Sequence, residues 1–500
     1  MIEKEKQMEK FKAYMKQMSD LGHAIMLIDW DLKTGAPKNA APAHISALTN
    51  LSTQQFEMSV SDEMGAFLEE VEAHPERFDE VSIWAAKKLR KDYDATKNIP
   101  TALYSKFVRL TSESEHVWEK AKNNNDFAGF KPYLEEIVTT LKEMAHYRNP
   151  NQKPYDVLLD DFEPGLTSDE ITLIFRELRD GIVPLVEEIK EKEQIDDRML
   201  IGHFSKAEQE KLAYFILDYM GYQMDSGKLS ESEHPFTTGT APFDVRLTTH
   251  YMLDDARSSL FSVLHEGGHG IYEQNINPAF EATPLATGTS MGIHESQSRF
   301  YENIIGRNKA FWVPIYGEVQ KIIPGYKDVD LDTFYRGINK VTPSLIRTEA
   351  DELTYSLHVI LRFELEKALF EGSLEVKDLP EAWREKMKHY LGVVPETDTE
   401  GVLQDTHWAG GAFGYFPSYA LGNVYGAQFM QQIEKEEGPL EDLLAKGELG
   451  CITNWLNKHI HQYGAAKTPI EIIRESCHEG INTRPLIRYF EEKYKKLYHL

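Results

Sequence analysis

Hydrophobic residues recur at helical spacing along most of this chain. Near the N-terminus, six apolar positions alternate in steps of three and four residues and predict one amphipathic helix: Phe11, Tyr14, Met18, Leu21, Ile25 and Ile28. Thr167 and Glu170 have the capping-box spacing that opens a helix. Similar patterns predict helices over residues 54–74, 80–97, 101–123, 130–147, 205–222, 355–371 and 425–446. We therefore expect a mainly α-helical fold.

One stretch has a different pattern. Residues 236–239 and 243–252 are rich in β-branched and aromatic residues, with turn signals between them. This predicts a small antiparallel β-sheet whose last strand leads directly into the next helix. Asp254 or Asp255 would cap that helix at its N-terminus. We find no internal repeat, low-complexity tract or clear linker, so we expect residues 1–500 to form a single catalytic domain.

Composition narrows the function classes. The 500 residues are 41 % hydrophobic and carry a formal net charge of −26, which argues against nucleic acid and anionic membranes as partners. The first six residues contain no apolar run typical of a secretory signal, and no stretch approaches the length of a membrane span. The two cysteines, Cys451 and Cys477, fit a reducing cytoplasm. We expect a cytoplasmic protein.

The candidate chemistry lies in the segment His265-Glu266-Gly267-Gly268-His269. On a helix, positions i and i+4 share a face, so both imidazoles can reach one zinc ion. Glu266 can then meet a metal-bound water as a general base. Each glycine costs about 1 kcal/mol inside a helix, which a purely structural helix would avoid. Small residues are useful here if a ligand or another backbone approaches closely.

A catalytic zinc site needs a third protein ligand and one open position. A metzincin would place a histidine six residues after the second one, with a glycine between, but this chain has Asn275 and Tyr272 at those places. The remaining solution is a carboxylate from a following helix, and residues 290–299 form such a pattern. Glu295 is our candidate for the third ligand, although a helical glutamate is as often a solvated residue.

Further segments resemble the thermostable, Taq-type metallocarboxypeptidases, which are gluzincins with the HExxH motif. The segments lie in the family's order: His234-Pro235-Phe236, Asp244-Val245-Arg246-Leu247-Thr248, the histidine motif, His294-Glu295-Ser296-Gln297, Ile346-Arg347-Thr348-Glu349-Ala350-Asp351 and Gly401-Val402-Leu403-Gln404-Asp405-Thr406-His407-Trp408. Residues 30–37 and 155–165 resemble the family's N-terminal half. The resemblance implies a neurolysin-like helical fold with a deep groove. Residues 1–200 would form the groove wall, and residues 201–500 would carry the zinc site. The resemblance also implies a homodimer.

The resemblance also implies roles for residues near residue 410. His407, the pair Gly410-Gly411 and a following tyrosine are similar to the oxyanion-binding set of neurolysin-like enzymes. Counting from the glycine pair selects Tyr419 as hydroxyl donor, with Tyr415 in reserve. A hydrogen-bonded core histidine or core aromatic residue is the structural alternative for each.

A carboxypeptidase must also bind the free C-terminal carboxylate of its peptide substrate, which suits the planar fork of an arginine. Arg347 lies in a family block among apolar neighbours, and Arg246 is the competitor unless it pairs with Asp244 or Asp351. His234 could line the groove or be structural.

The expected function is a zinc carboxypeptidase, in which Co²⁺ could replace zinc. A zinc oligoendopeptidase and a non-catalytic peptide-binding protein are the alternatives. Glu302, seven residues after Glu295 on the same helical face, could orient a ligand histidine or could be an ordinary surface glutamate.

Overall fold

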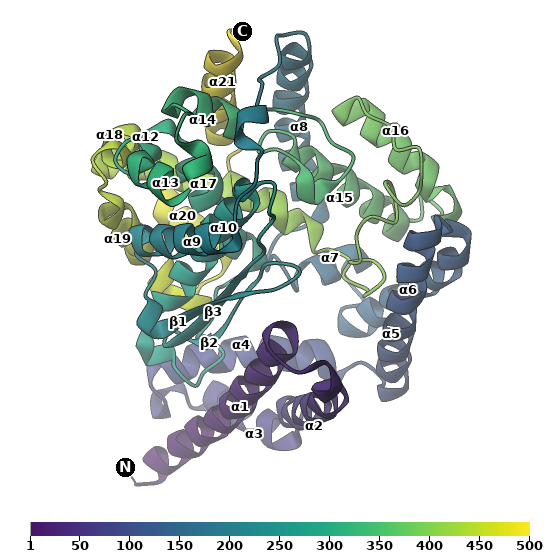
Figure 1. Ribbon diagram of the computed structural model, residues 1–500. Coiled ribbons are helices and arrows are strands. Elements are labelled where there is room, and N and C mark those ends of the chain that lie inside the picture. The colour runs from purple at the N-terminus through teal and green to yellow at the C-terminus, as the bar shows by residue number, and fades with distance from the viewer. Residues whose placement is uncertain (1) are drawn as a thin grey trace.

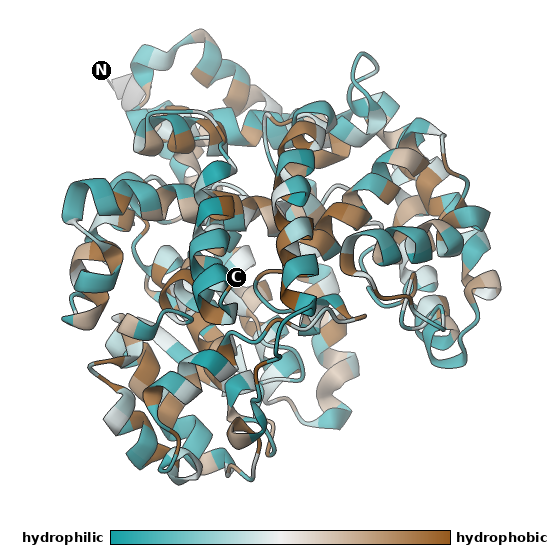
Figure 2. Ribbon diagram, turned by 90° about the horizontal axis from the view of Figure 1, so that it is seen from above, coloured by the Kyte–Doolittle hydropathy of each residue, from teal (hydrophilic) through white to brown (hydrophobic). Residues whose placement is uncertain are grey.

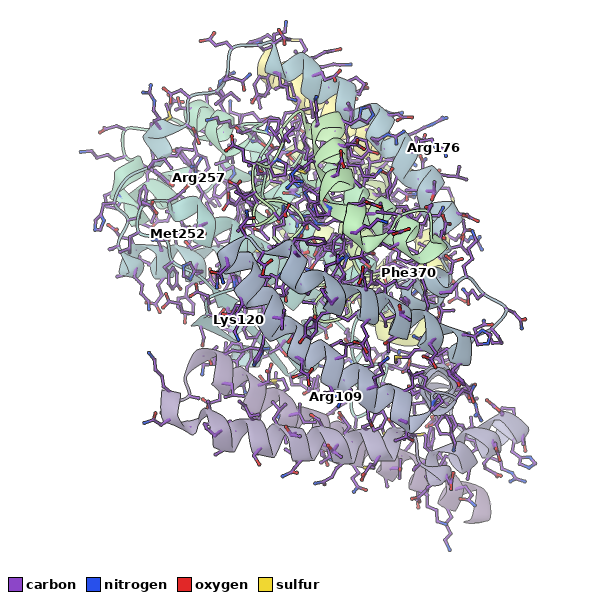
Figure 3. The ribbon with its side chains drawn as sticks, turned by 90° about the vertical axis from the view of Figure 1, so that its right-hand side faces the viewer. Arg109, Lys120, Arg176, Met252, Arg257 and Phe370 are labelled. Carbon is purple, nitrogen blue, oxygen red and sulfur yellow. The ribbon has the colours of Figure 1, made fainter. Side chains whose placement is uncertain are left out.

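The amphipathic pattern at the N-terminus folds into the long helix α1 (Ile2–Thr34), in a computed structural model that describes residues 2–500. Phe11 and Trp30 of this helix are buried: Phe11 packs against Phe67 of a following helix, and Trp30 packs against Phe236, next to the sheet. Seven further helices complete the N-terminal region: α2 (Ala41–Ser59), α3 (Asp62–Ala73), α4 (Glu80–Lys97), α5 (Thr101–Asn124), α6 (Phe127–Arg148), α7 (Pro154–Leu159) and α8 (Ser168–Lys190). The first helices gather along one side of the molecule (Figure 1), beneath α5 with Arg109 and Lys120 (Figure 3).

Most predicted helices are present, and their ends follow local signals. Helix α8 begins with the predicted capping box of Thr167 and Glu170. The helix predicted over 54–74 is instead two, because Ser61 caps α3 by accepting a hydrogen bond from the backbone N–H of Met64. The helix predicted over 425–446 is also two, α17 (Phe416–Glu437) and α18 (Leu440–Ala445). They are separated at Gly438, whose φ of 106° ends the helical path.

The small sheet has three strands: β1 (Gly227–Glu231), β2 (Thr237–Ala241) and β3 (Asp244–Thr249). β3 lies in the middle, antiparallel to β2 as predicted. β1 was not predicted, and it pairs parallel with β3, so the sheet is mixed rather than antiparallel. Leu229 is the one apolar residue of β1 and its one buried residue, so this strand has too little alternation to be detected.

The C-terminal region contains further helices: α9 (Lys206–Met220), α10 (Ala256–Gln274), α11 (Met291–Arg299), α12 (Lys309–Trp312), α13 (Tyr316–Ile322), α14 (Leu331–Ile338), α15 (Tyr355–Glu371), α16 (Leu379–Leu391), α19 (Leu449–His459), α20 (Pro469–Cys477) and α21 (Arg484–Tyr498). Asp255 caps α10, as one of the two predicted caps. A π-helical turn (Phe300–Ile305) continues α11.

Helix α17 is central to this region, because it packs along α11 and is buried over most of its length. Outer helices carry hydrophilic and hydrophobic stretches in alternation along the ribbon (Figure 2), as amphipathic helices do. Within residues 2–500, none of the helices is both long and apolar enough to cross a bilayer.

A buried carboxyl group joins the two halves of the chain at α11. Glu163, which follows α7, is fully buried and accepts hydrogen bonds from Ser418 Oγ at 3.1 Å and from the backbone N–H of Gly292. Gly292 lies in the first turn of α11, whose N–H groups have no intrahelical partner. Burial raises the pKa of Glu163 to about 7, although these hydrogen bonds oppose the shift. Glu163 therefore fixes the start of the helix that carries Glu295.

Candidate metal centre and substrate groove

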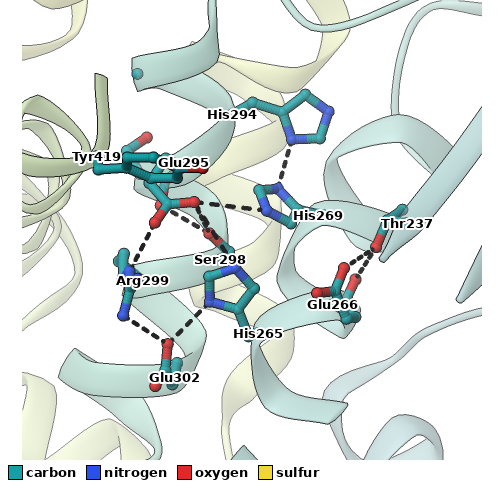
Figure 4. Close-up of polar contacts among 12 residues, drawn as sticks. Thr237, His265, Glu266, His269, His294, Glu295, Ser298, Arg299, Glu302 and Tyr419 are labelled. Atoms are coloured by element: carbon teal, nitrogen blue, oxygen red, sulfur yellow. Dashed lines mark hydrogen bonds and ion pairs between the residues drawn. The ribbon is translucent and has the colours of Figure 1, made fainter. Parts of the chain in front are cut away.

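Three donor atoms from two helices converge at one point. His265 and His269 lie one turn apart on α10, and Glu295 faces them from α11 (Figure 4). The Nε2 atom of each histidine lies 3.7 Å from Glu295 Oε2. All three donor atoms lie within 4.8 Å of one another. Ligand distances near 2.0–2.2 Å to a central ion require such separations, so this donor set fits a divalent metal with nitrogen and oxygen ligands.

The glycines of the histidine motif allow α10 and α11 to approach closely. A Cβ atom on Gly268 would lie 2.6 Å from the carbonyl oxygen of Gln297 and 2.8 Å from Cα of Ser298. On the other side of α11, a Cβ atom on Gly422 of α17 would lie 2.7 Å from Cγ of Glu295. The backbone approach expected from the two motif glycines is therefore present at Gly268. It places Glu295 within reach of both histidines.

The partner of His265 is Glu302, as its position seven residues after Glu295 suggested. His265 Nδ1 lies 2.8 Å from Glu302 Oε2, which leaves Nε2 directed at the metal position. Arg299 Nη1 also donates to Glu302 Oε2 at 3.1 Å. Burial opposes ionisation of Glu302, but Arg299, His265 and Arg307 lower its pKa to about 2. Glu302 is thus held as a carboxylate that orients His265.

Sequence reasoning did not identify two other contacts to the donor residues. Arg299 Nε donates to Glu295 Oε1 at 2.7 Å, so the other oxygen of that carboxylate faces the histidines. His269 Nδ1 lies 2.5 Å from His294 Nδ1, and His294 Nε2 lies 2.7 Å from Glu273 Oε1. Glu273 is four residues after His269 on α10, so helical spacing was an available signal for this cluster.

Glu266 points to the opposite side of α10 from the Glu302 contact, toward the sheet (Figure 4). Thr237 Oγ1 of β2 donates to Glu266 Oε2 at 2.6 Å. Burial raises the pKa of Glu266, while nearby His265 and the hydrogen bond from Thr237 lower it, and the net shift is upward. A carboxylate whose pKa is raised is a stronger base than an exposed one, which suits proton transfer.

Two cavities meet at the donor residues. The larger is about 920 Å³ and the smaller about 430 Å³. Four of the described residues line both of them: His265, Glu266, Glu295 and Tyr419. A peptide that runs through both cavities would therefore pass directly over the donor set.

Tyr419 and His407, the predicted oxyanion-binding residues, contact each other. His407 Nε2 lies 3.2 Å from Tyr419 Oη. Burial raises the pKa of Tyr419 well above 10, so its hydroxyl keeps its proton at neutral pH. Burial lowers the pKa of His407 to about 4, with Asp405 opposing this shift and Arg347 adding to it. His407 is therefore neutral at pH 7.

Tyr415, the reserve candidate, lines the smaller cavity but not the larger one. Its ring makes an edge contact with Tyr419, with centroids 5.0 Å apart. Tyr419 is thus the tyrosine at the junction of the cavities.

The two candidate arginines are in different places. Arg347 is buried and lines the larger cavity; its Nε and Nη2 donate to Asp405 Oδ1 at 3.1 and 2.8 Å, and its Nη1 donates to Tyr355 Oη at 3.2 Å. Of the described residues, Arg246 lines neither cavity. It pairs with Asp244 at 2.6 and 2.8 Å, and its guanidinium lies 5.6 Å from the ring centroid of Trp30 on α1. His234 lines the larger cavity.

Comparison with known proteins agrees with this geometry. Residues 10–494 match the family described as "Carboxypeptidase Taq (M32) metallopeptidase". The chain is 44 % identical to Carboxypeptidase 1 of Bacillus subtilis, over 98 % of this chain and 99 % of the relative. It is 38 % identical to Thermostable carboxypeptidase 1 of Thermus thermophilus, over 94 % of this chain and 95 % of the relative.

Among solved structures, the M32 carboxypeptidase from Deinococcus radiodurans R1 superposes with a TM-score of 0.96 at 32 % identity, covering 99 % of this chain and 100 % of that one. The mainly helical fold predicted from the sequence is therefore confirmed. This chain belongs to the carboxypeptidase Taq (M32) family of metallopeptidases and is a metallocarboxypeptidase.

Proposed function

We propose that this metallocarboxypeptidase uses zinc, held by His265, His269 and Glu295, to release C-terminal residues from peptides of broad sequence. One observation supports this most strongly: two of the three donors, His265 and Glu295, line both cavities together with Glu266 and Tyr419, and the larger cavity contains the buried Arg347. Two imidazoles with one carboxylate are a common ligand set for catalytic zinc. Co²⁺ accepts the same ligands and could replace it.

The protein's own groups then have separate roles. When bound, the ion would act as a Lewis acid and lower the pKa of a coordinated water to about 7. Glu266 would accept the proton of the attacking water and return it to the leaving amine. The Tyr419 hydroxyl would donate a hydrogen bond to the developing oxyanion, and His407 would assist through its contact with Tyr419 or with the substrate backbone.

Arg347 is our candidate for binding the C-terminal carboxylate. It lines the larger cavity together with His265, Glu295 and Tyr419, so the terminal residue would lie on that side of the scissile bond. Asp405 forms ion pairs with both Arg347 and Arg362, whereas Arg347 Nη1 donates to the hydroxyl of Tyr355 and not to a carboxylate among the described residues. His234 would contact the substrate within the same cavity. Arg246 is the weaker candidate, because Asp244 already occupies its fork.

An oligoendopeptidase, the alternative left open by the sequence alone, would share the metal chemistry but need no carboxylate site, and membership of the carboxypeptidase family sets it aside. A non-catalytic peptide-binding protein would need the histidines but not Glu266. Incubation of one peptide with the purified protein, with and without a chelator, followed by mass spectrometry, tests the proposed metal-dependent release. We expect a ladder of products shortened one residue at a time from the C-terminus, abolished by the chelator. Internal fragments, or an intact peptide without chelator, would contradict the proposed release.

We further propose that residues 1–500 act as one catalytic domain, as a homodimer in the cytoplasm. Cys451 and Cys477 are both free thiols, which suits a reducing compartment. The family resemblance is the support for the dimer, and light scattering on the purified protein tests it.

A further inference from the structure

The two histidines of the donor set differ in the residue that contacts Nδ1, the ring nitrogen directed away from the metal position. His265 contacts a carboxylate directly, through Glu302. His269 contacts a second imidazole, His294, which in turn contacts the carboxylate of Glu273. Both His294 and Glu273 line the smaller cavity, and Glu273 is buried. The mechanism proposed above uses neither of these two residues.

Metal binding fixes the proton positions along this chain of groups. His269 must present an unprotonated Nε2 to the ion, so in its neutral form the proton is on Nδ1. That N–H needs an acceptor, and the neighbouring atom at 2.5 Å is His294 Nδ1. His294 Nδ1 must then carry a lone pair, which places the His294 proton on Nε2. Any other neutral arrangement either sets two N–H groups against each other or leaves His269 unable to donate.

Glu273 selects this arrangement. Its Oε1 lies 2.7 Å from His294 Nε2 and can accept the proton there. The same oxygen is positioned by the backbone N–H of Gly288 at 3.1 Å and by Thr287 Oγ1 at 3.3 Å. A carboxylate oxygen is an acceptor and so favours the Nε2–H tautomer of His294. The effect of Glu273 reaches His269 through one intervening ring.

We propose that Glu273 and His294 are positioning residues that set the tautomer and orientation of His269, and thereby the affinity of the site for its metal. This inference rests on the proposed metal site. Outer partners of ligand histidines typically change metal affinity about 10–100-fold when they are removed.

The test measures the dissociation constant for Zn²⁺ by competition with a chromogenic chelator at fixed pH, so it does not depend on peptidase activity. Glu273→Gln keeps the size of the side chain but can donate its amide N–H to His294 Nε2, which favours the wrong tautomer. We expect it to weaken Zn²⁺ binding about 10–100-fold. His294→Leu, which removes the acceptor for His269 and leaves Glu273 in place, should weaken binding by a similar factor.

His294→Asn is the rescuing variant, because its Oδ1 can take the position of the ring Nδ1 and accept from His269. We expect Zn²⁺ affinity within about threefold of wild type. Adding Glu273→Gln to His294→Asn should have little further effect, because the intervening ring is gone. A structural role of Glu273 would instead give the full additional loss in the double variant. His389→Asn, at an exposed position on α16, is the control for the substitution itself.

Three results would overturn the inference: wild-type affinity in both Glu273→Gln and His294→Leu, a His294→Asn variant as weak as His294→Leu, or additive losses in the double variant. The proposed function is checked separately on the wild-type protein and on Glu295→Ala. If wild type binds Zn²⁺ tightly and Glu295→Ala does not, the proposed metal site is supported even when the proposed roles of Glu273 and His294 are wrong. If Glu295→Ala binds Zn²⁺ as tightly as wild type does, the proposed metal site and the proposed roles of Glu273 and His294 are both wrong.

Discussion

Thr237 Oγ1 of strand β2 lies 2.6 Å from Oε2 of Glu266, so the sheet holds the carboxylate of the proposed base beside the metal donors. The hydrogen bond ties the chemistry of α10 to a strand that also lines the smaller cavity. Among the described residues, the side-chain hydrogen bonds of Thr237 go to Glu266 and not to the two candidate ligand histidines. Metal binding and proton transfer should therefore separate by mutation.

Glu266→Gln should retain the metal and lose turnover. General-base catalysis typically contributes about 10²–10⁴-fold to a rate, so we expect a loss of that order in kcat. Glu295→Ala should lose the metal itself, because it removes one of three donors. Metal analysis of both purified variants, beside their kcat values, tests the division of roles. A folded Glu266→Gln protein without metal would contradict it.

Tyr419→Phe should lower kcat about 10²–10³-fold, the usual effect of removing one oxyanion donor, with little change in metal content. The reason is that Tyr419 lines both cavities beside Glu266 and Glu295. Tyr415→Phe is the matched control, since it removes the neighbouring hydroxyl from the smaller cavity alone. If the loss falls on Tyr415→Phe and spares Tyr419→Phe, the assignment of the donor is wrong.

Gly268→Ala should destabilise the protein and weaken its metal binding. The new methyl group would lie against the backbone of Gln297 and Ser298, which cannot move without shifting α11 and Glu295. Such overpacking typically costs about 1–3 kcal/mol. Gly267→Ala is the control in the same motif, because its methyl group would meet the flexible end of Met220. Thermal midpoints and Zn²⁺ titrations of both variants give the comparison, and equal effects would contradict this account of the motif.

Glu163 should make folding stability fall as pH rises from about 4.5 to 7. Burial raises its pKa to about 7 in the folded protein, so in this window the folded state keeps a proton that the unfolded chain has released. Above pH 7 the carboxyl of Glu163 is ionised in both states, so its effect on the free energy of unfolding no longer changes with pH. Glu163→Gln lacks this titration, so its stability relative to wild type should rise across the window by roughly 1–3 kcal/mol.

Urea unfolding at pH 4.5 and 7.5 measures that change. Glu187→Gln, an exposed substitution on α8, is the control and should show no such trend. A constant difference between Glu163→Gln and wild type at both pH values would mean that the buried carboxyl is ionised throughout.

Part of the candidate donor set follows from local spacing, whereas the choice of Glu295 depended on the resemblance to a known family. His265 and His269 share one face of a helix from sequence alone, and Glu302 follows Glu295 at a spacing that brought it to His265. The contact between His269 and His294 depends instead on how closely α10 and α11 pack, which Gly268 permits but does not specify.

Other features depended on tertiary contacts in the same way. β1 carries one apolar residue, so its own sequence pattern does not predict a strand. It forms one because it pairs with β3. The sequence favoured Arg347 over Arg246 only slightly, and the structure places the two arginines in different surroundings. Asp244, one of the two expected structural partners, contacts Arg246, whereas Arg347 faces the larger cavity.

The most direct test of the central claim compares matched peptides that end in a free acid or in an amide. If Arg347 binds the terminal carboxylate, wild type should prefer the acid on the order of 10²-fold or more in kcat/KM. Arg347→Ala should lose most of that preference, while Arg246→Ala should keep it. Because the ratio is taken within one protein preparation, partial unfolding does not change it. Equal rates on acid and amide in wild type, with internal fragments released, would contradict the account.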